Sequence, residues 1–358
     1  MAYIEINKNS IRCNAQILYD FCQKRGIQFC AVTKCCCSEA EIVNIIHDTG
    51  ILEIADSNQE NFKRLPEQTA ANVRKSLIKT RLTDIRLIPA LAPSARPQRV
   101  FVSDEALLEA LAEIPPAMRP DIMLTVEMGD LKDGFYPQQI LHVIKKYNRL
   151  PIVGISAGYA CVSGKMPEIK DAVMLSQLAN EIKTNDGRLP LASLGGTVAY
   201  PLFSDSRFQC AANAACAWEL RCGEGIFQGR DSALGEDLSG FENVAFVFFG
   251  EILEIREKEC REPEHRGNNA LGERNIIGKN GNRINMVLDF GVLAAPAKDL
   301  RPLDASVQII GQTYDFTIID ITESNVKYTV GGHIGFAPSY GAVSHAMVNN
   351  YVTKVYTS

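Results

Sequence analysis

The sequence predicts an α/β protein in which a (β/α)8 TIM-type barrel is followed by a C-terminal all-β domain. Eight apolar runs of strand length recur over about 220 residues, and amphipathic segments with helix-start signals follow most of them. Beyond Asp231 the sequence changes to longer alternating segments without a helical period, which is typical of antiparallel strands. A doubly wound open sheet is the alternative, but no G-x-G-x-x-G motif follows an early strand.

A short alternating strand opens the chain, and an amphipathic helix follows it. Ile11, Ala15, Leu18 and Cys22 form the apolar face of this helix, and Gly26 is expected to end it. The eight barrel strands are predicted at residues 28–33, 52–55, 85–88, 100–102, 122–126, 152–155, 189–194 and 217–220.

Five helices between these strands have recognisable start signals. Ser38, Asp56-Ser57 and Ser103-Asp104 precede the first three, and a proline precedes each of the other two. The helices are predicted at residues 39–46, 60–65, 106–114, 138–147 and 169–183.

The barrel domain is predicted over residues 7–232 and the β domain over residues 233–358, and we expect the strand at 1–6 to join the β domain. Between its strands, residues 262–282 are rich in Gly, Asn, Arg and Glu, which predicts a long exposed loop. The β strands are predicted at residues 243–256, 284–290, 307–321, 333–337 and 351–356.

The composition narrows the class of protein. A hydrophobic fraction of 46% suffices for a full-sized core, and a net charge of −5 with scattered basic residues argues against nucleic acid as a partner. No apolar run has the length of a membrane span, and the opening residues lack the pattern of a signal peptide, so a cytoplasmic protein is expected. The run Cys35-Cys36-Cys37 lacks the spacing of a zinc site, and no metal is predicted.

Candidate site residues lie where the barrel strands end, because barrel enzymes carry their active sites at the carboxyl ends of the strands. Lys34 follows the first barrel strand, where partial desolvation favours a free amine that can form an imine. Gly195-Gly196 with Thr197 follows the seventh strand, and a glycine-rich turn around Gly223 and Gly225 follows the eighth. Two such turns at neighbouring strands predict a phosphate-binding cradle.

These segments resemble the alanine racemase superfamily, in particular its ornithine racemase-like branch. The similarity spans nearly the whole chain in order. The segments that carry it are 32–34 (VTK), 54–57 (IADS) with 60–61, 86–89 (RLIP), 127–134 (EMGDLKDG), 154–155 with Cys161, 195–196, 219–231 (ELRCGEGIFQGRD) and parts of 340–352.

The resemblance implies pyridoxal 5′-phosphate (PLP) bound as a Schiff base to Lys34. It implies Arg221 at the pyridine nitrogen, which a guanidinium keeps unprotonated so that reprotonation at Cα is favoured. It further implies that the segments Gly196-Thr197 and Gly223-Glu224 hold the phosphate and that Tyr340 reaches it. A head-to-tail homodimer with the active site at the interface, and racemisation or epimerisation of a free amino acid through Cα deprotonation, are also implied.

The sequence departs from the family pattern on the substrate side. Lys132 stands where relatives usually have Arg, Gly158 replaces a polar residue near the ring, and Val198 replaces a phosphate-contacting Ser. Asn268 occupies the position at which relatives place an acid/base on the opposite face of the ring. The tetrad at residues 313–316, usually rich in Ser and ending in His, reads Thr-Tyr-Asp-Phe.

A carboxamide such as that of Asn268 does not exchange a proton near neutral pH, so the second proton-transfer group is left open. His265, Tyr159, Cys161 and Asp315 are the candidates to replace it. Besides racemisation, the sequence leaves two alternatives: a PLP enzyme of the same fold with decarboxylase or aldolase-like chemistry, and a non-catalytic PLP-binding homologue.

Overall fold

The computed structural model describes residues 1–184, 187–211, 216–261, 264–274 and 281–358. It divides into two compact units, one of residues 11–243 and the other of residues 1–10 and 244–358. None of the described helices is long and apolar enough to cross a membrane.

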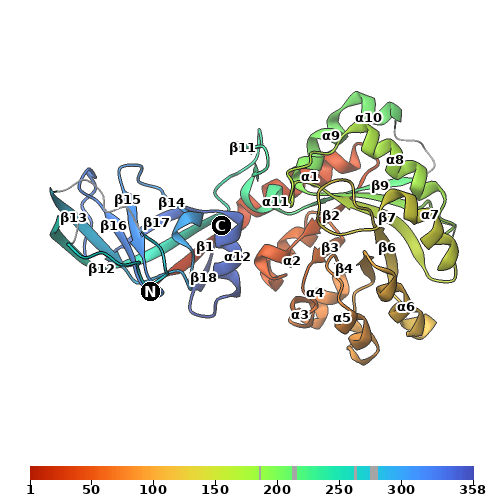
Figure 1. Ribbon diagram of the computed structural model, residues 1–358, viewed down its shortest axis with the longest axis horizontal. Coiled ribbons are helices and arrows are strands. Elements are labelled where there is room, and N and C mark those ends of the chain that lie inside the picture. The colour runs from red at the N-terminus through yellow and green to blue at the C-terminus, as the bar shows by residue number, and fades with distance from the viewer. Residues whose placement is uncertain (185–186, 212–215, 262–263, 275–280) are drawn as a thin grey trace. The chain divides into compact units, whose positions relative to one another are not determined.

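The first unit contains a closed barrel of eight parallel strands in sequence order, surrounded by helices (Figure 1). The last strand pairs with the first and places Arg221 opposite Cys30. The strands are β2 (Gln28–Val32), β3 (Glu53–Asp56), β4 (Arg74–Leu77), β5 (Arg99–Val102), β6 (Asp121–Thr125), β7 (Ile152–Gly158), β8 (Leu191–Gly195) and β9 (Ala217–Cys222).

Most helices of this unit lie between the barrel strands, as the alternating pattern predicted, while α1 precedes the first strand and α11 follows the last. They are α1 (Lys8–Gln23), α2 (Ala40–His47), α3 (Gln59–Lys63), α4 (Glu67–Asn72), α5 (Leu82–Leu87), α6 (Glu105–Glu113), α7 (Pro137–Lys146), α8 (Ile169–Asn180), α9 (Tyr200–Ser204), α10 (Ser206–Ala211) and α11 (Glu224–Gln228). Two short strands, β10 (Arg230–Asp231) and β11 (Glu236–Asp237), form a hairpin after α11. The predicted barrel is therefore confirmed.

Seven of the eight predicted barrel strands are confirmed, and the strand predicted at 85–88 is wrong. Those residues lie in α5 and the 3-10 turn after it, where Ile85 and Ile88 are buried at helical spacing. The missing strand is β4, which reads Arg-Lys-Ser-Leu. Its Ser76 accepts a hydrogen bond from Arg99 and donates one to Glu53, so this strand contributes a polar residue to the barrel interior.

The predicted helix ends are partly confirmed. The four apolar residues predicted on one face of α1 are fully buried, and Gly26 lies in the left-handed region at φ 65°. Asp104 caps α6 by accepting from the N–H of Ala106 at 2.8 Å. Ser38 does not cap α2, because its hydroxyl donates to Asp56 of the neighbouring strand instead.

An ionic network crosses the barrel interior. The Arg99 guanidinium lies 2.6 Å from a carboxylate oxygen of Glu219 and 3.0 Å from one of Glu53, and Ser193 donates to Glu219. Burial opposes the charge of Arg99, but the two carboxylates hold the pKa of its guanidinium above the ordinary value. Phe101, Met123 and Leu191 form an apolar cluster in the same barrel.

The second unit is a mainly antiparallel β structure in which β1 (Tyr3–Asn7) pairs with both β12 and β18. The rings of Phe248, Phe290 and Phe336 pack edge to face in its core. Its other strands are β12 (Phe246–Cys260), β13 (Gly281–Leu288), β14 (Leu300–Pro302), β15 (Gln308–Gln312), β16 (Thr317–Asp320), β17 (His333–Pro338) and β18 (Thr353–Thr357).

Two details of the β unit differ from the sequence prediction. The segment 307–321 forms two strands, β15 and β16, because a turn at residues 313–316 interrupts it. Helix α12 (Tyr340–Val348) was not predicted, and it begins at Ser339, whose hydroxyl accepts from the N–H of Ala342. The predicted loop at 262–282 falls partly outside the described residues, and residues 281–282 belong to β13.

Candidate active site

Lys34 lies directly after the carboxyl end of β2, as the first residue of a 3-10 turn (Lys34–Cys36). Its side chain is exposed, while Thr33 before it is fully buried. The N–H of Thr33 donates to the carbonyl of Ala55 at 2.8 Å, which ties the turn to β3. The amine therefore projects from a fixed backbone at the end of the barrel where barrel enzymes carry their sites.

Side chains from the next strand end hold this turn in place. The hydroxyl of Ser38 lies 2.8 Å from that of Thr33 and donates to Asp56 at 2.8 Å. Asp56 also accepts from the N–H of Asn58 and the amide of Asn61. Burial raises the pKa of the Asp56 carboxyl although all these donors oppose the shift.

We expect the substitution Asp56→Ala to lower both stability and activity. It removes the common acceptor of Ser38, Asn58 and Asn61, and the loss of these buried hydrogen bonds should reduce the free energy of unfolding by about 2 kcal/mol. Chemical denaturation checks the stability, and turnover at saturating cofactor checks the placement of Lys34. Asp48→Ala, at an exposed carboxylate after α2, is the matched control and should change neither.

Arg221 occupies the end of β9, next to β2 in the barrel, and is 7% exposed. Its Nη2 donates to the carbonyl of Ala157 at 3.3 Å, and its Cζ lies 4.3 Å from the centroid of the Phe101 ring. A Cβ on Gly195 would lie 2.5 Å from the same Nη2, so the guanidinium fills the space that this glycine leaves. Burial lowers the pKa of Arg221.

The substitution Gly195→Ala tests this contact. The new methyl group must displace the guanidinium of Arg221, and, if Arg221 meets the PLP ring as the resemblance implies, the affinity for PLP should fall about ten-fold. Gly158 pairs with Gly195 across β7 and β8, and a Cβ there would have 3.9 Å to its neighbours. Gly158→Ala should therefore keep the cofactor affinity of the parent protein, and equal effects of both substitutions would contradict the assignment.

The two predicted glycine turns are in contact. The N–H of Gly225 donates to the hydroxyl of Thr197 at 3.2 Å, and that hydroxyl lies 3.3 Å from the Cys222 sulfur. Gly196 adopts φ 112°, and its N–H donates to the carbonyl of Arg221. The turns after β8 and β9 thus form one surface beside Arg221.

Close packing requires a glycine at position 225. A Cβ there would lie 3.0 Å from the Cys222 sulfur and 3.5 Å from a Thr197 methyl carbon. Gly223 precedes α11, and the side chain of Glu224 turns to Ser232, accepting from its N–H and its hydroxyl. The side chain of Glu224 is therefore held by the chain itself.

Lys132 and Cys161 lie together next to Gly158. A Cβ on Gly158 would be 3.9 Å from both the Lys132 amine and the Cys161 sulfur. The Lys132 amine lies 3.0 Å from the carboxylate of Asp133. Burial raises the pKa of the Cys161 thiol, although the charges of Lys132 and Lys34 favour its thiolate.

Two carboxylates hold the loops that carry these residues. Glu127 accepts from the N–H groups of Gly129, Leu131 and Lys132, and Asp130 accepts from those of Cys161, Val162 and Ser163. Leu131 and Ala160, which precede Lys132 and Cys161, have the left-handed φ values 59° and 53°. Such strain in non-glycine residues persists only where the surroundings fix it.

Tyr159 points elsewhere. It is 2% exposed, and within the part of the chain that the structure describes its hydroxyl has no hydrogen-bond partner. Burial, together with Asp171 and Glu168 at the start of α8, raises the pKa of this hydroxyl. Its side chain therefore faces the first turn of α8, whereas Gly158 and Cys161 face Lys132.

The remaining predicted site residues belong to the β unit. Tyr340 is the first residue of α12 and is half-buried, while Asp315 is exposed in the turn between β15 and β16. His265 and Asn268 are exposed in the segment after β12. Asn269 accepts from the N–H groups of Leu271 and Glu273 and so stabilises a local turn.

Sequence reasoning overlooked the residues that position the site. Asp56, Glu127 and Asp130 lie in segments that carry the family resemblance, and Phe101 is the apolar neighbour of Arg221. An acidic residue at a strand end, followed by glycine or small polar residues, is the signal that could have indicated carboxylates that bind loop N–H groups. No group of three or more His, Cys, Asp or Glu among the described residues could hold a metal ion.

Two curated proteins are similar to the chain over nearly its whole length. No family model matches the chain. The ornithine racemase of Acetoanaerobium sticklandii is 26% identical over 362 residues, with 98% of each chain covered, and the lysine racemase of Thermotoga maritima is 23% identical over 98% of this chain and 97% of its own.

Among solved structures, alanine racemase from Corynebacterium glutamicum matches with a TM-score of 0.71 and 12% identity, covering 99% of both chains. Alanine racemase from Bartonella henselae with covalently bound pyridoxal phosphate matches with a TM-score of 0.70 and 13% identity over 99% of both chains. The fold is thus that of the alanine racemases. Over nearly its whole length the chain is similar to members of the alanine racemase superfamily, in particular to its ornithine racemase-like branch, as the sequence motifs predicted.

Proposed function

We propose that this protein is a PLP-dependent racemase of a free amino acid. The observation that carries the proposal is the neighbourhood of Lys34 and Arg221, which end the adjacent strands β2 and β9, beside two joined glycine turns. The two relatives that match over the whole chain are named as racemases of ornithine and lysine, which favours a basic amino acid as substrate.

The residues present fit the cofactor. Arg221 is a buried cation in the space left by Gly195, so its donors suit a ring nitrogen. The turns at Gly196-Thr197 and Gly223–Gly225 provide a hydroxyl and closely approachable backbone for a phosphate, and Tyr340 is proposed to reach it. When bound, PLP supplies an electron sink that makes the Cα proton of an amino acid acidic.

Residues of the chain would bind the cofactor and the substrate and would transfer the proton. Lys34 would hold the aldehyde carbon of the cofactor and would exchange a proton with Cα from its side of the substrate. Arg221 would donate to the ring nitrogen and keep it unprotonated. Lys132, whose backbone Glu127 fixes, would bind the substrate carboxylate beside Gly158.

The decisive experiment is hydrogen exchange in heavy water. The PLP-loaded protein, incubated with ornithine, lysine and a panel of other amino acids, should incorporate deuterium at Cα and lose optical rotation for at least one of them. Release of CO2 or an aldehyde without loss of stereochemistry, or no exchange with any amino acid, would overturn the proposed racemisation.

Cys161 is our proposal for the second proton-transfer group, because the barrel unit itself places its sulfur beside Lys132 and Gly158. His265, Asn268 and Asp315 lie in the β unit, and the Tyr159 hydroxyl faces α8. The substitution Cys161→Ala should slow racemisation about a hundred-fold while PLP still binds. Unchanged turnover of this variant would exclude the role, and the same measurement on His265→Ala would then test a titratable alternative.

We also infer a homodimer in the cytoplasm. Tyr314, Phe316 and Tyr351 of the β unit are 52%, 45% and 86% exposed, which supports a surface covered by a second copy. The ten cysteines whose side chains the structure describes are all free, which suits a reducing compartment. Sedimentation equilibrium should give twice the mass of the chain, and a monomer at micromolar concentration would contradict the dimer.

A further inference from the structure

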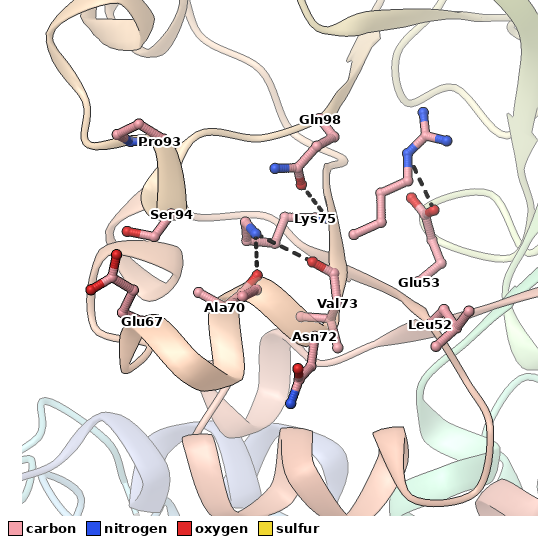
Figure 2. A pocket seen from close by; sticks show the side chains of 12 residues that line it. Leu52, Glu53, Glu67, Ala70, Asn72, Val73, Lys75, Pro93, Ser94 and Gln98 are labelled. Carbon is pink, nitrogen blue, oxygen red and sulfur yellow. Dashed lines mark hydrogen bonds and ion pairs between the residues drawn. The ribbon is translucent and has the colours of Figure 1, made fainter.

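A pocket lies at the opposite end of the barrel from Lys34. It has a volume of about 640 Å³ and is formed where β3, β4 and β5 begin, with α4 and the turn at Pro93–Ala95 as its other walls (Figure 2). The amino ends of the strands in a barrel normally serve stability rather than catalysis. The polar residues of the pocket therefore need an explanation of their own.

Lys75 is the unusual residue of this pocket. It lies in β4, is 1% exposed, and its amine donates to the carbonyls of Ala70 at 2.8 Å and Val73 at 3.3 Å. Figure 2 shows these two bonds at the end of α4, where a cation is favoured by the helix carbonyls. Among the described residues no carboxylate lies within ion-pairing distance of this amine, and its third N–H has no acceptor.

A buried ammonium without an anionic partner is costly, because two backbone carbonyls compensate only part of its lost hydration. Burial accordingly lowers the pKa of Lys75, and the charge of the more distant Glu53 only opposes the shift. An anion in the pocket would supply the missing partner. The amine is held in place by two backbone carbonyls before an anion binds, so little ordering of the side chain is needed on binding.

The other charges in the pocket restrict the kind of anion. Glu53 and Glu67 are negative, and Arg74 is positive but lies beside Glu53 at 3.6 Å and Asp121 at 2.5 Å. A polyanion such as phosphate would be repelled by the two carboxylates, whereas a single carboxylate needs only one cation. Ser94 and Gln98 add uncharged polar groups to the lining of the same pocket (Figure 2).

We propose that this pocket binds a small monocarboxylate, whose carboxylate accepts the free N–H of Lys75. The pocket is separate from the proposed racemase site, so its occupancy can be measured without reference to turnover. Lys75 lies in β4 and Glu53 in the neighbouring strand β3. A ligand in the pocket would therefore influence the barrel through the first residues of these two strands.

Thermal unfolding of the PLP-loaded protein tests the site, with propionate as the probe. Propionate should raise the unfolding temperature in a saturable manner relative to chloride at the same ionic strength, because a ligand that binds only the folded state stabilises it. Inorganic phosphate should bind at least ten-fold more weakly. Phosphate binding as tight as propionate would overturn the proposed ligand class.

Two substitutions with opposite expected effects complete the test. Lys75→Met should weaken propionate binding at least ten-fold, and Glu67→Gln should strengthen it about three-fold by removing a negative charge from the wall. Glu67 is exposed, so its variant keeps the proposal testable even where Lys75→Met fails to fold. A propionate response that neither substitution alters, or no saturable response in the parent protein, overturns the proposal.

Discussion

The substitution Lys34→Ala is expected to abolish racemisation. Removal of the amine takes away both the group that would hold the PLP aldehyde and the group that would exchange the Cα proton, so turnover should fall at least about a thousand-fold. The visible absorption band of the bound cofactor should disappear as well. Absorbance spectroscopy, borohydride trapping with peptide mapping, and deuterium exchange at Cα measure these three effects.

Lys145 offers a matched control, because it is an exposed lysine on α7, on the outside of the barrel. Lys145→Ala should keep the absorption band and the turnover of the parent protein. A Lys34→Ala protein that still racemises its substrate, or a trapped peptide that contains another lysine, would refute the assignment of the cofactor to Lys34.

The substitution Arg99→Met should have the largest effect on stability. Arg99 is 3% exposed and is the common partner of Glu219 and Glu53, so its loss removes the closest cation from both buried carboxylates and leaves Glu53 with Arg74 at 3.6 Å. Breaking such a buried network should reduce the free energy of unfolding by about 3–5 kcal/mol. Urea denaturation followed by circular dichroism gives this value directly.

The pH dependence identifies the cause of that loss. Burial already raises the pKa of Glu53 although Arg99 opposes it, so removal of Arg99 should raise this pKa further. A carboxyl whose pKa is higher in the folded than in the unfolded state binds its proton more readily when folded. The deficit of Arg99→Met should therefore shrink as the pH falls from about 8 to 5.

Two further variants distinguish lost charge pairing from lost packing. Adding Glu219→Gln to Arg99→Met should recover part of the stability, because it removes one of the unpaired carboxylates. Arg207→Met, at a 78% exposed arginine, should leave the stability unchanged. A double variant that is less stable than Arg99→Met would show that packing, rather than charge, causes the loss.

The barrel was predictable from the sequence because seven of its strands are short apolar runs between helices. Strand β4 was not, because its inward-facing residue is Ser76 and its outward-facing residue is Lys75. A strand that places polar side chains in the barrel interior lacks the apolar run by which strands are predicted. The buried isoleucines of α5 were instead taken for such a strand. Helix α12 was missed because its apolar residues do not form the one-sided pattern that predicts an amphipathic helix.

The positions of the site residues could be predicted to the extent that strand ends determine them. Lys34, Arg221 and the two glycine turns all lie at carboxyl ends of barrel strands, where the barrel architecture brings them to one face. The orientation of Tyr159 towards α8 could not be predicted, since successive residues after a strand end follow the loop rather than the strand alternation. The loop-binding carboxylates Glu127 and Asp130 escape pattern analysis because their partners are backbone N–H groups.

The ionic network inside the barrel has an evolutionary consequence. Glu53, Arg99 and Glu219 come from three strands that are far apart in the sequence, yet each depends on the others for a buried charge partner. A single mutation at any of these positions gives a destabilised protein, so we expect substitutions at the three positions to occur together. Across homologues these positions should either be retained as a set or be replaced together by uncharged residues.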